Sequence, residues 1–196
     1  GDVDPMYSVA YRFTLAGFIM LGIAKLGKFR LRFTRREHAF ILLQGLFLFG
    51  FNYWFIYISE LYLTSGLVGL IFSFLVFFNI FNSRIFLKSP VQLQVIVGAI
   101  FGLSGTALIF WDDLSQFSLA GSKIIGMLFA LGGTLVASFG NITSARNQKI
   151  GIPVIASNAF GMTYGGLTML FIALLTGKEI SFIVSTEYIG SLIYLA

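Results

Sequence analysis

The chain alternates long apolar stretches with short polar connections, and this pattern predicts membrane-spanning helices. About 20 consecutive apolar residues are needed to cross a bilayer as an α-helix. No stretch alternates with period two for long enough to suggest an outer-membrane barrel. A partial run begins near Tyr188, and six runs of the required length precede it: Met6–Leu26, Ala39–Ile58, Leu61–Ser83, Val91–Trp111, Ile124–Ala145 and Ile150–Thr176.

Composition agrees with this pattern. Hydrophobic residues make up 57% of the 196 positions and charged residues 11%, whereas soluble domains have roughly 45–50% and 25%. One aqueous core cannot hide so much apolar surface in a chain of this length. We therefore predict an all-α integral membrane protein, a polytopic helical bundle whose surroundings are the lipid bilayer. The sequence has no cysteine, so it offers no disulfide framework.

The basic residues gather in alternate connections. Ten of the thirteen Lys and Arg residues fall in the segments 25–36, 84–90 and 146–150. Basic loops mark the cytoplasmic side of membrane proteins, so these three loops are predicted to be cytoplasmic and the protein to lie in the plasma membrane, the inner membrane in a bacterium. The charge thus signals topology and not a nucleic-acid partner. The opposite face receives Asp2, Asp4, Glu60, Asp112, Asp113, Lys123, Lys178, Glu179 and Glu187.

A segment of the first run recurs in the sixth. Ser8–Lys25 aligns with Ser157–Leu174 at a shift of 149 residues, which indicates that the protein is built from two similar halves. The alternating loops make the two copies cross the membrane in opposite directions, as in the inverted repeats of secondary transporters. Eight of the eighteen positions are identical, at Ser8/Ser157, Ala10/Ala159, Thr14/Thr163, Gly17/Gly166, Met20/Met169, Leu21/Leu170, Ile23/Ile172 and Ala24/Ala173.

An odd number of spans in each half, here five, accounts for the inversion. The intact protein is then expected to have ten helices, and this chain to hold the second to the seventh and the start of the eighth. Residues 1–120 would form the first repeat without its first helix. Residues 121–196 would form the second repeat, truncated after the start of its third helix.

Six short motifs along the chain point to a known family. They are Tyr11-Arg12-Phe13, Leu15-Ala16-Gly17, Leu63-Thr64-Ser65-Gly66, Leu70-Ile71-Phe72-Ser73, Val97-Gly98 with Gly102 and Gly105, and Gly126 to Ala137. These motifs resemble the EamA family of the drug/metabolite transporter superfamily, whose members have ten spans in two five-helix repeats. The resemblance covers essentially the whole chain. It departs from the family where a Pro is usual in the fourth helix and a Leu-Gly-Glu near its cytoplasmic end, since Val76 and Leu87-Lys88-Ser89 stand there.

Polar residues within the runs are the candidates for substrate binding. Arg12 lies about 9 Å into its helix, where a charge costs ~2.5–3.5 kcal/mol unless it faces a cavity or a partner; a cation there would attract a carboxylate, although the side chain could also snorkel to the surface. For the other residues, an interfacial belt or hydrogen bonding between helices is the alternative role. The remaining candidates are Asn52, Tyr53, Tyr57, Ser73, Asn79, Asn141, Asn158 and Tyr164.

Metal, cofactor and catalytic chemistry find little support in the sequence. His38 is the only histidine and is assigned to the basic loop, so no metal cluster can be assembled around it. Asp112-Asp113 has no second acidic motif, and no glycine-rich phosphate loop is present. We expect no cofactor, no metal and no catalytic residue.

The sequence therefore predicts a secondary transporter, an exporter of small metabolites, amino acids or drugs that works by alternating access. A membrane-embedded enzyme and a non-transporting scaffold subunit stay open as alternatives, and so does a homodimer. The substrate itself is not encoded in any motif.

Overall fold

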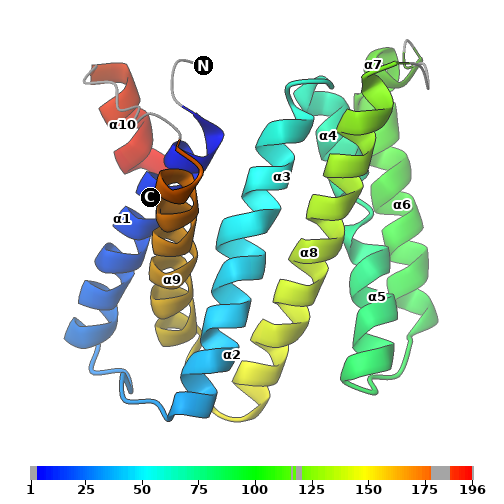
Figure 1. The fold of residues 1–196 in the computed structure, drawn as a ribbon. Coiled ribbons are helices and arrows are strands. Elements are labelled where there is room, and N and C mark those ends of the chain that lie inside the picture. The colour runs from blue at the N-terminus through cyan, green and yellow to red at the C-terminus, as the bar shows by residue number, and fades with distance from the viewer. Residues whose placement is uncertain (1–3, 116, 118–120, 178–185, 196) are drawn as a thin grey trace. The chain divides into compact units, whose positions relative to one another are not determined.

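The computed structural model describes residues 4–115, 117, 121–177 and 186–195, and these residues form helices and connections without a strand (Figure 1). Asp2, Lys178 and Glu179, predicted for the outer face, lie outside the described residues. The elements are α1 (Pro5–Leu26), α2 (Arg35–Gly45), the π-helix η1 (Leu46–Phe51), α3 (Asn52–Ser59), α4 (Ser65–Phe72), α5 (Leu75–Phe86), α6 (Leu93–Ile109), α7 (Trp111–Ser115), α8 (Lys123–Lys149), α9 (Val154–Leu175) and α10 (Thr186–Leu195).

Each predicted apolar run is helical, which confirms the polytopic helical class. Five stretches of the described residues are long and apolar enough to cross a membrane: Pro5–Leu26, Arg35–Ser59, Ser65–Phe86, Lys123–Lys149 and Val154–Leu175. The fourth run forms α6, which has 17 residues and a length of about 26 Å, at the lower limit for a span.

Two boundaries differ from the prediction. The third run begins at Ser65 and not at Leu61, because Thr64 accepts a hydrogen bond from Leu67 N and starts the helix there. His38 belongs to the first turn of α2 and not to the basic loop, because the helix begins at Arg35. Both corrections come from N-capping threonines, whose side chains satisfy backbone N–H groups that a helix end leaves unpaired.

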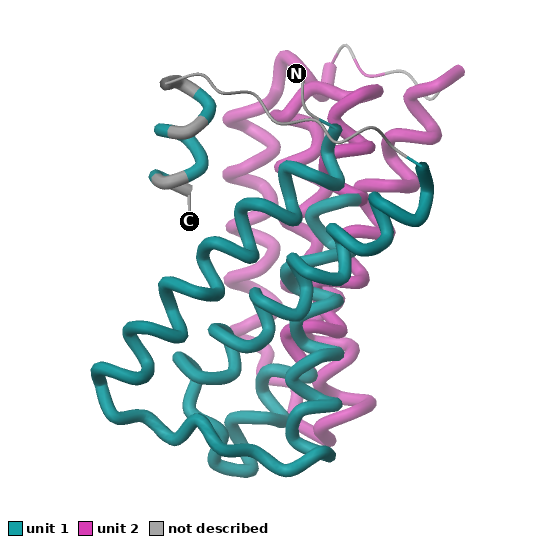
Figure 2. The backbone as a smooth tube through the Cα atoms, turned by 60° about the vertical axis from the view of Figure 1, so that its left-hand side comes forward, with its two compact units in different colours: residues 1–54, 143–196 teal, residues 55–142 magenta. Residues whose placement is uncertain are grey.

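The chain folds into two compact units, coloured separately in Figure 2. Unit 1 comprises residues 1–54 and 143–196, and unit 2 comprises residues 55–142. The chain passes from one unit to the other within α3 and again within α8.

In unit 1, α1 packs most extensively against α9, and small residues let the two backbones meet. A Cβ atom added to Gly17 would fall on Thr163, 2.6 Å from its backbone nitrogen, and one added to Gly166 would fall on Thr14, also 2.6 Å from its backbone nitrogen. Close approach of this kind is typical of helix pairs in membranes. Lipid tails are as apolar as the side chains, so close van der Waals packing at small residues drives the helices together. The two helices run antiparallel, since the later residue of α1, Gly17, meets the earlier residue of α9, Thr163.

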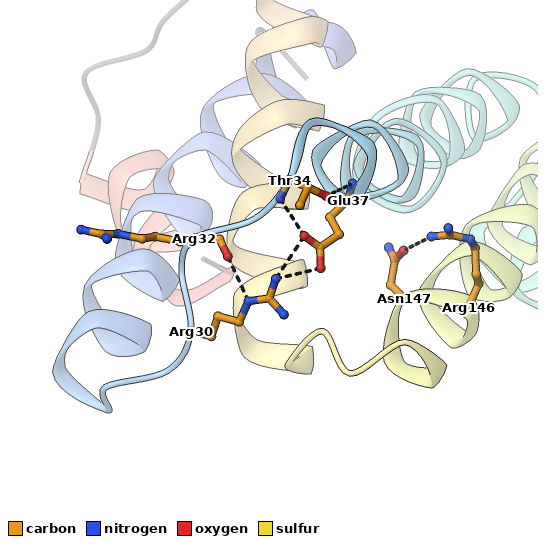
Figure 3. A network of polar contacts seen from close by, with 6 residues as sticks. All are labelled: Arg30, Arg32, Thr34, Glu37, Arg146 and Asn147. Atoms are coloured by element: carbon orange, nitrogen blue, oxygen red, sulfur yellow. Dashed lines mark hydrogen bonds and ion pairs between the residues drawn. The ribbon is translucent and has the colours of Figure 1, made fainter.

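The start of α2 is fixed by a capping box (Figure 3). Glu37 N donates to Thr34 Oγ1 over 3.3 Å, and Thr34 N donates to the Glu37 carboxylate over 2.6 Å. Arg30 pairs with the same carboxylate at 2.9 and 3.1 Å and also donates to the carbonyl of Arg32. Glu37 thereby neutralises one cation of the basic segment and stabilises the helix end.

Unit 2 uses a similar device at α4. Thr64 is the N-cap, and its Oγ1 donates to Asp113 Oδ1 over 2.9 Å. The second oxygen of that carboxylate stands where a Cβ on Gly66 would be, so Asp113 lies against the positive end of the helix. The apolar centre nearby contains Leu63, Leu67 and Val68.

Candidate substrate site

Arg12 lies among aromatic rings in unit 1. It occupies α1 and is half-buried, with its guanidinium carbon 5.1 Å from the ring centroid of Phe13 and 5.1 Å from that of Tyr53. The Phe13 ring in turn packs against Tyr53 at 4.7 Å and Phe49 at 5.3 Å. Cation–π attraction of this kind contributes about 0.5–2 kcal/mol. The structure therefore brings together two of the predicted residues, Arg12 and Tyr53, and adds Phe13 and Phe49 to them. We call these four residues the Arg12 cluster.

Asn52 precedes Tyr53 and is almost completely buried, at 6% exposure. Its Nδ2 donates to the carbonyl of Leu48 over a long 3.4 Å, while its Oδ1 is buried without a hydrogen-bond partner among the described residues. An unpaired buried polar atom costs about 1–3 kcal/mol. Since the unpaired atom is an acceptor, a ligand that satisfied it would need to carry an N–H or O–H group.

Asn158 and Tyr164 bind neighbouring helices. Asn158 Oδ1 accepts from Gln44 Nε2 over 2.9 Å, and Tyr164 Oη shares a hydrogen bond of 2.9 Å with His38 Nδ1. Both bonds join α9 to α2. The sequence offered two roles for these residues, and the structure shows bonds between helices; substrate binding stays a prediction for both.

The bond to Asn158 is one link of a longer chain. Gln44 Oε1 accepts from Asn147 Nδ2 over 2.9 Å, and Asn147 Oδ1 accepts from Arg146 Nη1 over 3.1 Å (Figure 3). Gln44 and Asn147 are fully buried. The guanidinium carbon of Arg146 also lies 3.3 Å from the ring centroid of Phe40. We call Arg146, Asn147, Gln44 and Asn158 the amide chain, and it ties α2, α8 and α9 together.

Four predicted residues belong to unit 2. Asn141 Nδ2 donates to Asn79 Oδ1 over 3.4 Å, and Ser73 Oγ donates to the Gly69 carbonyl over 3.0 Å. Tyr57 is half-buried on α3. Asn79 also lines a cavity of about 390 Å³, whose other polar lining residues are Ser83, Ser89 and Gln92.

Beside the first of these pairs, Asn82 Nδ2 donates to Ser138 Oγ over 2.8 Å. The polar residues Asn79 and Asn82 of α5 therefore face α8. Two hydrogen bonds between helices hold that pair together within the membrane.

Sequence reasoning missed Gln44, Asn147 and His38. Gln44 is one of two amides in an apolar run, the other being Asn52, and an amide in such a run is the signal that could have marked it. Asn147 sits beside Arg146 in a basic connection, and His38 was placed in a loop, so nothing in the sequence pointed to their burial or their bonds. Glu60 follows the end of α3, outside the candidate spans, and desolvation raises the pKa of its carboxyl above the ordinary value.

These features define a polytopic helical membrane protein with a half-buried cation among aromatic rings. The family model described as the EamA-like transporter family matches residues 1–111, more than half of the chain. The chain therefore belongs to the EamA-like transporter family, in agreement with the resemblance to the drug/metabolite transporter superfamily, and is an integral membrane protein.

Relatives agree with this assignment. A protein of Archaeoglobus fulgidus named "Uncharacterized transporter" is 24% identical over 157 residues, which cover 80% of this chain and 54% of that protein. A protein of known crystal structure has the same fold, with a TM-score of 0.78 at 17% identity, over 100% of this chain and 65% of that one. The chain thus spans about half the length of the curated relative.

Proposed function

We propose that the protein is a secondary transporter that exports small metabolites by alternating access between two inverted halves. The division into residues 1–120 and 121–196 as parts of two repeats belongs to this proposal. Export as the direction of transport belongs to the same proposal.

The reciprocal contact between α1 and α9 carries this proposal. Thr14 meets Gly166 and Gly17 meets Thr163, and the repeat pairs Thr14 with Thr163 and Gly17 with Gly166. Equivalent residues therefore exchange places across the contact, as they do about a two-fold axis. A two-fold axis in the membrane plane is the symmetry of inverted repeats, whose shared interface holds the substrate in secondary transporters.

The Arg12 cluster is the substrate site that we propose, with the unpaired Oδ1 of Asn52 as a second point of attachment. A guanidinium bonds a carboxylate with two parallel hydrogen bonds, and aromatic rings accommodate the apolar part of a metabolite. We therefore expect a small carboxylate-bearing substrate. Tyr57, Ser73, Asn79 and Asn141 of unit 2, and Asn158 and Tyr164 of unit 1, stay predicted substrate residues.

Reconstitution of the full-length protein in liposomes tests this proposal. A panel of radiolabelled amino acids and small carboxylic acids is compared with uncharged analogues of similar size. We expect the carboxylates to be transported, and Arg12→Ala to lower their rate at least tenfold, because a lost charge-assisted pair is worth roughly 1.5–3 kcal/mol.

Arg32→Ala is the matched control, since Arg32 is an exposed cation of the basic segment and its loss should leave the rate within twofold. Equal rates for Arg12→Ala and the native protein would exclude Arg12 as a substrate residue. Failure of every carboxylate in the panel would exclude the substrate class.

A further inference from the structure

The span Arg35–Ser59 is interrupted in its middle by a π-helix. The regular helix α2 ends at Gly45, η1 occupies Leu46–Phe51, and α3 begins at Asn52. In a π-helix, hydrogen bonds close one residue later than in an α-helix, so each turn holds about one residue more. No Pro lies in this segment to force the irregularity. The contacts on either side of η1 supply its cause.

The segment before η1 is held firmly by α9 and α8. Gln44 takes part in two hydrogen bonds of the amide chain, and both its polar atoms are satisfied. A Cβ on Gly45 would fall on the carbonyl of Gly161, so the two backbones touch there. Rotation of α2 about its axis would break these contacts at once. Its register is therefore fixed.

The stretch from Phe49 in η1 to Tyr53 in α3 is held by α1 through the aromatic rings of the Arg12 cluster. Phe49 and Tyr53 both pack on Phe13. In an uninterrupted α-helix, Asn52 would point about 80° away from Gln44, at 100° per residue. One additional residue in η1 reduces this angle to about 20°. The extra residue thus reconciles the packing on α9 with the packing on α1.

Asn52 is incompletely bonded in this register. Its donor makes a 3.4 Å bond and its acceptor has no partner, although the side chain is buried. Gly50 near the centre of η1 leaves room for a methyl group, because an added Cβ would make ordinary van der Waals contacts with the side chain of Met169 at 3.4 Å and the carbonyl of Gly165 at 3.8 Å. The residue that follows the π-helix, Asn52, therefore has an unpaired acceptor, and the π-helix itself has room for a methyl group at Gly50. Both are properties of an element with a second accessible state.

We propose that η1 is a register switch, in which conversion between π- and α-helix turns Asn52 and Tyr53 by about 100° relative to Gln44 and thereby opens or closes the Arg12 cluster during transport. This inference rests on the proposed function, because it assigns the movement to the transport cycle. In the π-helical state, η1 holds one residue more than an α-helix would need to span the same distance. The amide chain fixes the position of the helix that precedes η1.

Deletion of Leu46 tests the switch, because it removes this additional residue. The five residues left can close as an α-helix while Asn52 and Tyr53 keep their present orientation. The matched control is deletion of Leu15 in α1, which lies between the two residues that contact α9. It removes a residue from a regular helix and turns Thr14 by about 100° relative to Gly17, so that they cannot both face α9. We expect the Leu46 deletion to fold with nearly native thermal stability and the Leu15 deletion to misfold.

The movement itself is followed by ¹⁹F NMR of the full-length protein in lipid nanodiscs, with 3-fluorotyrosine placed only at Tyr53. We expect a doubled or exchange-broadened resonance for the native protein and one sharp resonance after deletion of Leu46. Transport of the carboxylates that pass the liposome screen should fall at least tenfold in the same variant.

The same sharp resonance in both proteins, or native transport by the deletion variant, would overturn the switch. Misfolding of the Leu46 deletion would also overturn it, because the additional residue is dispensable for packing. If the native protein transports none of the carboxylates, the proposed substrate class fails, and the resonance of Tyr53 still decides whether η1 changes register.

Discussion

Buried polar side chains in this protein fall into two kinds at the scale of single residues. Gln44 and Asn147 have both ends of their amides satisfied, whereas Asn52 has an acceptor without a partner. The first kind fixes helices to one another, because breaking one link leaves its neighbours unpaired in an apolar surrounding. The second kind is suited to a ligand or to a movement.

Gln44→Leu should lower the free energy of unfolding by about 1–3 kcal/mol, because it leaves Asn147 and Asn158 each without one hydrogen bond. Thermal unfolding of the purified protein in detergent or nanodiscs measures the effect. Gln148→Leu is the control: Gln148 is exposed, and its side chain donates to Ser144 Oγ on the same helix. A loss of equal size in both variants would argue against the amide chain.

The sequence indicated which polar residues lie within helices but not which of them meet. Asn158 and Tyr164 were recognised as polar positions of the sixth run. Their partners Gln44 and His38 are 114 and 126 residues away, and the order of contacts between helices is set by packing that no local pattern encodes. Arg12 was identified from its depth in the helix and from the resemblance to the EamA family, and Tyr53 was named separately. That these two residues meet, with Phe49 beside them, could not be predicted from the sequence.

At the scale of elements, glycine decides where helices touch. Gly17 and Gly166 are in contact with the facing backbone, while Gly22 in the same helix as Gly17 faces open space. A methyl group is therefore expected to have opposite consequences at positions only five residues apart.

Gly17→Ala and Gly166→Ala should each destabilise the protein by about 1–3 kcal/mol, because the added methyl group forces α1 and α9 apart. The two losses should be similar, since the contacts are reciprocal. Gly22→Ala should be neutral or slightly stabilising, because alanine favours a helix by about 1 kcal/mol over glycine. Thermal unfolding of the three variants measures these differences in stability. A native melting temperature for Gly17→Ala would contradict the close contact between α1 and α9.

Hydrophobic runs predicted the helices well, because membrane helices must satisfy their backbone internally and so leave a clear apolar signal. The same apolar signal does not show where the backbone departs from a regular α-helix within a run. The change from α4 to α5 near Ser73 and the π-helix η1 carry no charged residue or proline. The π-helix arises from the contacts of the span with α1 and α9, so the sequence pattern alone could not predict it.

At the scale of the whole molecule, the distribution of charge predicts how the chain sits in the membrane. The basic segment 25–36 and the connection 176–187 should lie on opposite sides, because α1 and α9 run antiparallel and the positive-inside rule places the basic segment in the cytoplasm. This sidedness is the basis of the inverted repeat that we propose.

Single cysteines at Lys28 and Thr176, both exposed, test the sidedness, because the printed sequence contains no other thiol. A membrane-impermeant maleimide applied to intact cells should label Thr176→Cys and not Lys28→Cys. Permeabilised cells, as the control, should give labelling of both. Labelling of both positions from outside would refute the antiparallel arrangement of the halves in the membrane.

The exchange of Thr14 with Gly166 and of Gly17 with Thr163 bears on the ancestry of the protein. Two separate copies of an ancestral half, inserted in opposite orientations, could pair through these same four positions, because such self-complementary pairing requires the same residues on both partners. Gene fusion would then have had to supply only a linker, and the halves could have associated as separate chains before they were joined into one polypeptide.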